Sequence, residues 1–439
     1  MIHFRPDLAA LPAPRYTSYP TAAQFSGGVG AVEQAAAIAR IAPGTPVSLY
    51  LHIPYCRQIC WYCGCNTGAV RGDAARDARL SSYVTALEAE IATVSARMQG
   101  RVTGIQFGGG SPNSLSAAVL AGIIASLREK FDVADDAEVG VELDPRALDA
   151  DYIPALAAAG VNRISLGVQT LAPHVQARIN RVQPFEMIAA AVKSARDHGI
   201  AGINFDLMYG LPTQTEADLA DTIAKALTLQ PDRVAVFGYA HMPAMIPRQK
   251  MIADAELPDA ELRFAQSALA HRLFTAAGYA AIGFDHFARP DDAMAIAAEN
   301  GTLRRNFQGY TTDPGEATIG LGTTAISQFD DLIVQNDKHV AGWRDTVLAG
   351  QLAGDRGVAR TEDDRARAHA IERLLCDGEI DVGTAYPPAL AALRRYADDG
   401  LISLDAGAVR LRPEGWPYAR LIAAAFDAHF DGARHSRAV

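Results

Sequence analysis

Short apolar runs rich in β-forming residues alternate along this chain with stretches whose apolar residues recur at helical spacing. We expect strands at Ser48–Ile53, Val102–Phe107, Glu138–Leu143, Asn162–Val168, Ile203–Met208 and Arg233–Phe237. The helical stretches between them are Leu80–Met98, Leu115–Lys130, Pro184–His198 and Glu216–Leu227. Buried strands that alternate with helices form βαβ units and a parallel sheet. The pattern therefore predicts an α/β fold, which we expect to be a (β/α)6 partial TIM-type barrel; a doubly wound open sheet is the alternative.

Both ends of the chain depart from this alternation. Residues 1–45 contain Pro, Gly and Ser with little periodicity, which predicts an arm rather than a core element. Near the other end, helical stretches at Thr361–Gly378 and Tyr386–Asp399 precede a hairpin at 401–412. That order resembles a winged helix and predicts a small, mostly helical cover domain. We thus expect an arm at 1–45, the barrel and its extension at 46–350, and a C-terminal domain at 351–439.

Composition narrows the class of protein. The 439 residues carry a formal net charge of −10, which argues against a broad nucleic-acid-binding face. The N-terminus has an early Asp7 and no apolar segment typical of a signal peptide, and no apolar run approaches the 18 residues of a membrane span. We expect a cytoplasmic monomer.

Four of the five cysteines lie within ten positions, on a loop that follows the first strand: Cys56, Cys60, Cys63 and Cys65. The Cys-x3-Cys-x2-Cys spacing brings together three thiolates, soft ligands that favour zinc, copper(I) or iron-sulfur clusters. Three thiolates on a four-iron cube leave one iron open for chemistry. A structural zinc site is the alternative, although such sites usually show a second ligand pair and only Cys376 and His52 remain as candidates. A disulfide is a further alternative, disfavoured because nothing marks the chain as secreted.

Polar and glycine-rich residues end the later strands, where the chemistry of parallel α/β proteins is found. Gly108–Ser111 follows the second strand, and its missing Cβ atoms allow a ligand or backbone to approach closely, although a tight turn explains a glycine run equally well. Glu142 ends the third strand. A buried carboxylate needs a partner, which is a ligand or, alternatively, Arg163.

These motifs resemble a known family. The cysteine spacing, with aromatic Tyr62 before the last ligand, is similar to that of radical S-adenosylmethionine enzymes. The wider set of motifs, from PRYTSYPT at 14–21 through LHIPYCRQICWYCGCN, GGGSP, GVQ, YGLP and HFARP to NFQGYTT, resembles the oxygen-independent coproporphyrinogen III oxidases. The resemblance implies oxidative decarboxylation of two propionates of coproporphyrinogen III to vinyl groups, giving protoporphyrinogen IX through a 5′-deoxyadenosyl radical. It also implies an electron donor such as flavodoxin or ferredoxin.

The resemblance further implies roles for particular residues. It makes Cys56, Cys60 and Cys63 ligands of a 4Fe-4S cluster, and Tyr50, Cys65 and Glu142 catalytic residues. It implies two S-adenosylmethionine molecules, bound by Tyr50, Tyr62, Gly109, Gly110, Ser111, Glu142, Gln169, Arg181, Asp206, Ala240 and Ile326. Ser111 stands where the family more often has Thr, and its hydroxyl is retained.

Substrate contacts are sought among arginines, because a tetrapyrrole with four carboxylates needs cations and flat apolar side chains. Arg15, Arg289 and Arg304 are the candidates, with Tyr16 and Tyr19 of the arm covering the rings; the alternatives are ordinary surface arginines and an arm that is a simple tether. Two other functions remain open. A haem carrier or haem-degrading paralogue is expected to lack the arm motif and Cys65, and a non-catalytic zinc-binding module is expected to lack iron.

Overall fold

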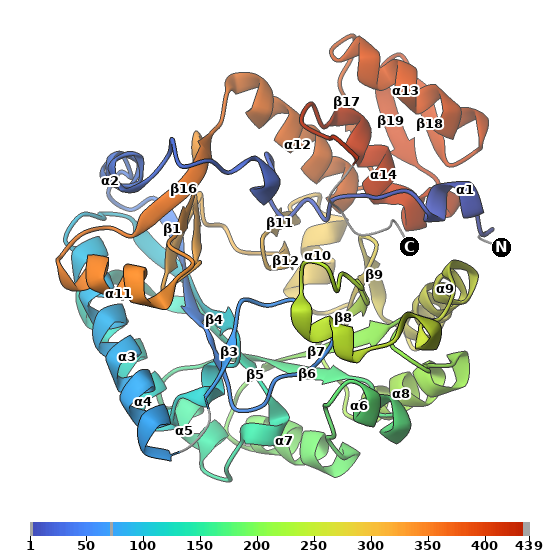
Figure 1. Ribbon diagram of the computed structural model, residues 1–439. Coiled ribbons are helices and arrows are strands. Elements are labelled where there is room, and N and C mark those ends of the chain that lie inside the picture. Colours follow the sequence, from blue (N-terminus) through green and yellow to red (C-terminus); the bar gives the residue numbers. More distant parts are fainter. Residues whose placement is uncertain (1–2, 71–72, 433–439) are drawn as a thin grey trace.

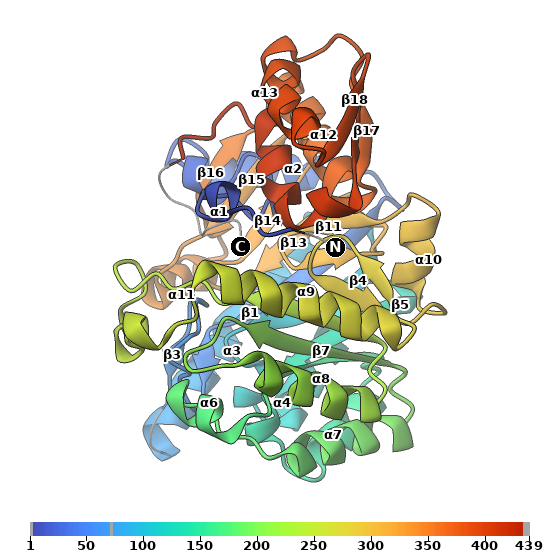
Figure 2. The same cartoon turned by 90° about the vertical axis from the view of Figure 1, so that its right-hand side faces the viewer.

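The computed structural model describes residues 3–70 and 73–432 as a curved sheet with helices on its outer face and a smaller unit above it (Figures 1 and 2). The expected strands are confirmed as neighbouring parallel strands. They are β1 (Pro46–Ile53), β4 (Arg101–Gly109), β5 (Asp132–Leu143), β6 (Arg163–Gln169), β7 (Gly202–Tyr209) and β8 (Arg233–Gly238). Their carboxyl ends therefore lie along one edge.

The sheet extends beyond the strands expected from the sequence. Parallel β13 (Ala317–Leu321) pairs with β1, followed by antiparallel β14 (Ile326–Gln328), β15 (Leu332–Asn336) and β16 (Gly354–Ala359). Antiparallel β10 (His286–Ala288) and β9 (Ala280–Ile282) continue the sheet past β8. Because β16 pairs with β15, residues 354–359 belong with the large sheet rather than with the C-terminal unit. The division into domains otherwise stays a prediction.

Helices cover the outer face of the sheet (Figure 1). They are α3 (Asp73–Ser95), α4 (Ala117–Lys130), α5 (Tyr152–Ala158), α6 (Pro173–Arg178), α7 (Phe185–Asp197), α8 (Glu216–Thr228), α9 (Ala260–Ala276) and α11 (Val340–Leu348). Successive side chains of a strand point to opposite faces of the sheet. In β5, Val139, Val141 and Leu143 are buried in the main hydrophobic cluster, whereas Glu142 points the other way, into a cavity. Side chains needed for chemistry thus face the inside of the curve.

The C-terminal unit has its own hydrophobic core. It contains α12 (Glu362–Cys376), β17 (Glu379–Asp381), α13 (Pro387–Asp398), β18 (Ile402–Asp405), β19 (Ala408–Leu411) and α14 (Ala419–Ala423). The expected β18–β19 hairpin is confirmed, and β17 pairs with β19 to complete a small sheet. Figure 2 shows this unit above the large sheet, with α1 (Pro6–Ala9) of the N-terminal arm beside it.

The N-terminal arm is not the peripheral segment that the sequence suggested. Leu8, Tyr16 and Tyr19 are buried in the C-terminal hydrophobic cluster. The Tyr16 hydroxyl donates to Asp427 Oδ2 at 3.0 Å, and the Tyr19 hydroxyl accepts from the Ala428 backbone amide at 2.9 Å. The expectation that these tyrosines cover substrate is therefore wrong, because both rings anchor the arm to the C-terminal unit.

The remaining helices and strands are short. They are α2 (Ala31–Ala39), β2 (Tyr55–Cys56), β3 (Gly68–Ala69), α10 (Ala293–Glu299), β11 (Arg304–Asn306) and β12 (Gly309–Thr311). Among the described residues, no helix combines the length and the apolar character needed to cross a membrane.

Candidate active site

A cavity of about 620 Å³ opens at the carboxyl ends of the parallel strands. It brings together residues that are far apart in the sequence but were predicted to act together. Its lining includes Cys56, Cys60, Cys63 and Cys65 together with Tyr62, Gly109, Gly110, Ser111, Glu142, Gln169, Arg181, Asp206 and Ala240. Arg15 of the arm also lines this cavity. This shared wall follows from the topology, because adjacent parallel strands present their ends at one edge.

The cysteine loop is held at both of its ends. Strand β2 pairs with β3, and Cys56 Sγ lies 3.1 Å from Thr67 Oγ1 across the base of the loop. Further along the loop, the Trp61 amide donates to the Ile179 carbonyl at 3.0 Å. The Cys65 amide donates to Cys63 Sγ at 3.4 Å. The backbone of Cys65 therefore supports the last expected cluster ligand.

The thiol chemistry of the loop fits a cluster. In the described part of the chain, no three His, Cys, Asp or Glu side chains gather as ligands around a single metal ion. A four-iron cube instead binds each thiolate at a different iron, so its three ligands are spread over one face of the cluster. Hydrogen bonding from Cys65 lowers the pKa of the Cys63 thiol to about 6, whereas burial raises that of Cys56 to about 11. Three separated thiols around one cavity wall are the donor set that such a cluster needs.

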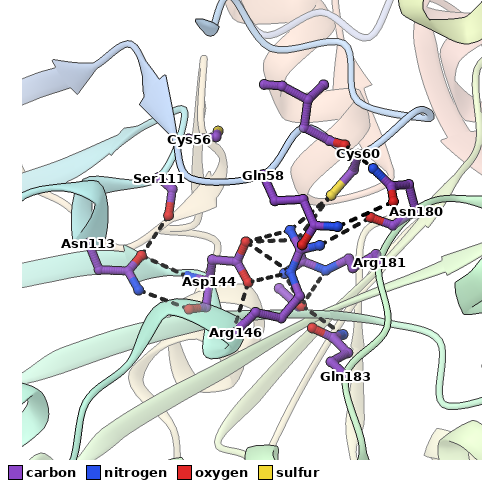
Figure 3. A network of polar contacts seen from close by, with 12 residues as sticks. Cys56, Gln58, Cys60, Ser111, Asn113, Asp144, Arg146, Asn180, Arg181 and Gln183 are labelled. Atoms are coloured by element: carbon purple, nitrogen blue, oxygen red, sulfur yellow. Dashed lines mark hydrogen bonds and ion pairs between the residues drawn. The ribbon is translucent and has the colours of Figure 1, made fainter. Parts of the chain in front are cut away.

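Two arginines converge on Cys60. Arg146 Nη2 lies 3.2 Å and Arg181 Nη1 3.4 Å from Cys60 Sγ, and both guanidinium groups pair with Asp144 (Figure 3). Burial acts to raise the pKa of Asp144, but Arg181 and Arg146 outweigh it and hold the pKa below its usual range. Sequence reasoning identified Arg181 and missed Asp144 and Arg146, although the Asp-Pro-Arg run directly after β5 was a usable signal.

Two carboxyl groups face the middle of the cavity. Burial, with the nearby Asp206, raises the pKa of Glu142 to about 8, and burial raises that of Asp206 to about 6. Glu142 has room because Gly108 has no side chain; a Cβ there would lie 2.8 Å from Glu142 Oε1. The alternative partner Arg163 is wrong, because its Nε donates to Glu138 Oε2 at 2.8 Å instead. Glu142 is thus a buried carboxyl group poised for a ligand.

The glycine run packs against the backbone of the cysteine loop. The Gly110 amide donates to the Ile53 carbonyl and the Ser111 amide to the Tyr55 carbonyl, each at 2.8 Å. A Cβ on Gly110 would lie 2.7 Å from the Tyr55 carbonyl oxygen. Gly109 has φ of +105°, a conformation that side chains rarely adopt. Glycine is therefore needed at Gly110 because the backbone of the cysteine loop packs too closely against it to leave room for a side chain.

Tyr50 and Ile326 lie outside the residues that line the cavity. The Tyr50 hydroxyl is 3.2 Å from His52 Nδ1, and its ring packs edge-on against Phe307 with centroids 4.6 Å apart. Burial, together with the charges of Glu142 and Cys65, raises the pKa of Tyr50. Ile326 on β14 lies next to Gly320, the residue that pairs with Tyr50 across β1 and β13.

Two of the three expected substrate arginines lie outside the lining of this cavity. The backbone amide of Arg289 donates to the carbonyl of Asp232, which precedes β8. Arg289 therefore lies at the amino end of that strand, and its Nε pairs with Asp291 at 3.1 Å. Arg304 is exposed and donates to the Gly315 carbonyl at 2.9 Å. Neither residue lines the cavity, so the structure does not bring them to this site, and their role in substrate binding stays a prediction. Arg15 lines it, with Nη2 3.2 Å from the Gly238 carbonyl.

The segment after β8 covers the cysteine loop and was not anticipated. Gln249 Nε2 donates to the Tyr62 carbonyl at 2.8 Å and to the Ala240 carbonyl at 3.0 Å. Arg248 Nη2 donates to the Cys65 carbonyl at 3.2 Å. These side chains connect the loop to the opposite wall of the cavity. The mixed composition of residues 240–252 gave no sign of this contact.

Comparisons with known proteins agree with this geometry. Residues 50–226 match the model of the radical SAM superfamily. The chain is 45% identical to the oxygen-independent coproporphyrinogen III oxidase of Bradyrhizobium diazoefficiens over 97% of each chain. It is 40% identical to that of Cereibacter sphaeroides, over 97% of this chain and 96% of the relative. A solved structure of Escherichia coli coproporphyrinogen III oxidase, described as a radical SAM enzyme, superposes with a TM-score of 0.90 at 37% identity, covering 95% of this chain and 98% of that one.

Proposed function

The chain belongs to the family of oxygen-independent coproporphyrinogen III oxidases, and from that premise we propose that it oxidatively decarboxylates two propionates of coproporphyrinogen III to vinyl groups, giving protoporphyrinogen IX. Each propionate loses one hydrogen atom, one electron and carbon dioxide. The observation that carries the proposal is the convergence of the cysteine loop, two arginines and two buried carboxyl groups on one cavity at the strand ends. The relatives' names favour this oxidase over a haem carrier or haem-degrading paralogue.

Cys56, Cys60 and Cys63 hold the 4Fe-4S cluster in this proposal. The cluster and S-adenosylmethionine supply, when bound, a one-electron reductant and a 5′-deoxyadenosyl radical that removes hydrogen from the propionate. Arg146 and Arg181 both donate to Cys60 Sγ and hold this ligand in position. Gln249 and Arg248 donate to carbonyls of the loop and hold its backbone against the segment after β8.

The carboxyl groups and the glycine run form the cofactor wall. Gly110 and Ser111 lie beside the cysteine loop and would hold the amino acid part of S-adenosylmethionine. Glu142 and Asp206 lie further along the same cavity, and their oxygens would accept hydrogen bonds from the cofactor. A positively charged ligand in the cavity would favour their ionised forms, which burial alone disfavours.

Finer parts of the assignment extend this proposal. We propose that β1 to β8 form a (β/α)6 partial barrel and that the C-terminal unit is its cover domain. We also propose a second S-adenosylmethionine molecule, bound toward Ala240, because the cavity continues from the cysteine loop to that residue. An electron donor of the flavodoxin or ferredoxin class, a monomeric state and a cytoplasmic location complete the proposal.

An anaerobic assay tests the function. Reconstituted protein is incubated with S-adenosylmethionine, dithionite and coproporphyrinogen III, and porphyrins and 5′-deoxyadenosine are quantified. We expect protoporphyrinogen IX, with one 5′-deoxyadenosine for each propionate lost. The Cys60→Ser variant is the matched control and gives neither product. Cofactor cleavage without any vinyl product from wild-type protein would contradict the proposal.

A further inference from the structure

A second cavity of about 970 Å³ adjoins the first. The two share a boundary formed by Arg15, Phe237, Gly238, Tyr239, Ala240 and Met242. Ligand sites in proteins typically range from about 300 to 1,000 Å³, so this cavity lies at the large end of that range. A molecule in it can therefore reach the cofactor cavity directly across this boundary.

The lining of the second cavity combines flat apolar side chains with arginines. Phe264 of α9, Phe284, and Trp416 of the C-terminal unit contribute aromatic rings. Arg263 extends over the Tyr209 ring, with 5.8 Å between Cζ and the ring centroid. Arg420 lies over Phe284, also at 5.8 Å, and donates to the Ala13 carbonyl at 3.0 Å. Such a lining suits a large ring system that carries carboxylates.

Positive charge accumulates at this site. Burial, with repulsion from Arg15 and Arg305, lowers the pKa of Arg420 to about 10. Arg305 Nη2 donates to the Arg15 carbonyl at 3.0 Å. Within the described residues its Nε and Nη1 atoms are buried without a hydrogen-bond acceptor. Arg15 of the arm, Arg305 and Arg420 of the C-terminal unit therefore lie close enough together for their charges to interact.

The acidic residues near these arginines are already engaged. Asp285 Oδ1 is bonded to His286 Nδ1 at 2.6 Å. Asp259 accepts the Leu262 amide at 2.8 Å as the N-cap of α9. Asp254 is 88% exposed and bonds His241 at 2.9 Å. Asp254, Asp259 and Asp285 thus line the cavity together with its three arginines, and each of these aspartates has a hydrogen-bond donor other than those arginines.

From these contacts, and resting on the function proposed above, we propose that the second cavity is the tetrapyrrole site and that Arg15, Arg263 and Arg420 bind substrate carboxylates. The aromatic side chains cover the pyrrole rings, and the shared boundary presents one propionate to the cofactor. Because Arg420 belongs to the C-terminal unit, that unit supplies a substrate ligand as well as a cover. The arm joins the same site, since the Ala13 carbonyl accepts from Arg420 and Arg15 follows two residues later.

Kinetics with coproporphyrinogen III test the assignment. Removing a charge-assisted hydrogen bond raises KM by at least about tenfold in both Arg263→Met and Arg420→Met. Arg420→Lys retains the charge and restores part of the loss. Ser267→Trp, on the cavity wall of α9, raises KM by occupying space without changing charge. The matched control is Arg410→Met, which removes an exposed arginine of the same unit that pairs with Glu379 at 2.5 Å and leaves KM unchanged.

Iron content and thermal midpoint show whether each variant is folded. If Arg420→Met does not fold, Arg263→Met and Ser267→Trp decide the question. KM values within about twofold of wild type for both would overturn the site. Binding of coproporphyrin III, the stable oxidised form, followed by its fluorescence, is a second readout. A wild-type protein that binds this porphyrin in an arginine-dependent manner yet makes no protoporphyrinogen IX would contradict the proposed function and support the cavity.

Discussion

Arg181 Nη1 lies 3.4 Å from Cys60 Sγ and 3.4 Å from Asp144 Oδ2, so one buried guanidinium joins an expected cluster ligand to a carboxylate. The other end of the same group donates to the Gly167 carbonyl of β6 at 2.6 Å. The end of β6 therefore holds the Arg181 guanidinium in place, and this guanidinium puts a positive charge beside the Cys60 thiol. Arg181 thus links the cysteine loop electrostatically to the strand ends that carry the cofactor wall.

Arg181→Met tests that coupling. The substitution keeps the length of the side chain but removes charge-assisted hydrogen bonds, each of which is worth about 1.5–3 kcal/mol. We expect S-adenosylmethionine affinity to fall at least about tenfold in calorimetric titration of the anaerobic protein. The control is Arg40→Met, because Arg40 pairs with Asp331 at 2.8 Å on an exposed surface. Equal affinity of the two variants for S-adenosylmethionine would show that Arg181 does not contribute to cofactor binding.

The cysteines are distinguished by iron content. Cys56→Ser, Cys60→Ser and Cys63→Ser each remove a ligand, and we expect iron and sulfide per chain to fall to near zero. Cys65→Ser retains the cluster, because the three expected ligands and the backbone amide that donates to Cys63 Sγ are kept, and loses much of the activity. A Cys65→Ser protein without iron would show that the ligand set is wrong.

Gly110→Ala tests the close contact of the glycine run. A Cβ there meets the Tyr55 carbonyl at 2.7 Å and the Ile53 carbonyl at 2.8 Å, so the backbone of the cysteine loop has to move. We expect lower cluster occupancy as well as weaker S-adenosylmethionine binding. Gly122→Ala is the control, since a Cβ on that α4 residue meets nothing within 4 Å. Normal iron content in Gly110→Ala would confine the role of this glycine to the cofactor.

The strand ends and the polar residues at them were predictable from the sequence, because the spacing of apolar residues and the residues that follow each strand are local features of the chain. Each apolar run from β1 to β8 was followed by a recognisable change of composition, and the topology of parallel strands placed Glu142, Gln169 and Asp206 together. By contrast, β9 and β14 are only three residues long, too short to show a period of their own. Their pairing depends on long-range contacts that no local pattern encodes.

Side-chain partners were less predictable than strand ends. Arg289 and Arg304 were selected by type alone, and the sequence does not reveal which end of the sheet a loop residue reaches. Arg420 was overlooked because its position at the cavity depends on how the C-terminal unit packs against the rest of the chain. The burial of Tyr16 and Tyr19 depends on the same packing.

Arg15→Ala separates the chemical role of the arm from its structural role. Arg15 is exposed and lines both cavities, whereas neighbouring arm residues are buried in the C-terminal core. We expect Arg15→Ala to lower vinyl formation strongly with unchanged thermal stability. Deletion of residues 1–22 should in addition lower the thermal midpoint, because it removes Tyr16 and Tyr19 from that core. Full-rate formation of protoporphyrinogen IX by Arg15→Ala would leave the arm with a structural role only.

Glu90 provides a pH-dependent test of stability remote from the chemistry. Its carboxylate is buried at the C-terminal half of α3, where it accepts from the Gly322 amide at 2.6 Å, Asn336 Nδ2 at 2.7 Å and Trp343 Nε1 at 3.1 Å. Burial nevertheless raises the pKa of Glu90 from 4.5 to about 7. The folded state therefore holds a proton that the unfolded chain has released. This contribution to stability is complete below pH 4.5 and is lost as the pH rises to 7.

Glu90→Gln removes this titration. We expect the free energy of unfolding of wild type, relative to Glu90→Gln, to decrease by about 2 kcal/mol between pH 5.5 and pH 8, at roughly 1.4 kcal/mol per pH unit up to pH 7. Urea denaturation of the anaerobic protein at several pH values measures the difference. Glu129→Gln, on the exposed face of α4, should follow the wild-type curve. Parallel curves for wild type and Glu90→Gln would mean that Glu90 is ionised throughout this range, because its three hydrogen-bond donors then stabilise the carboxylate more than burial disfavours it.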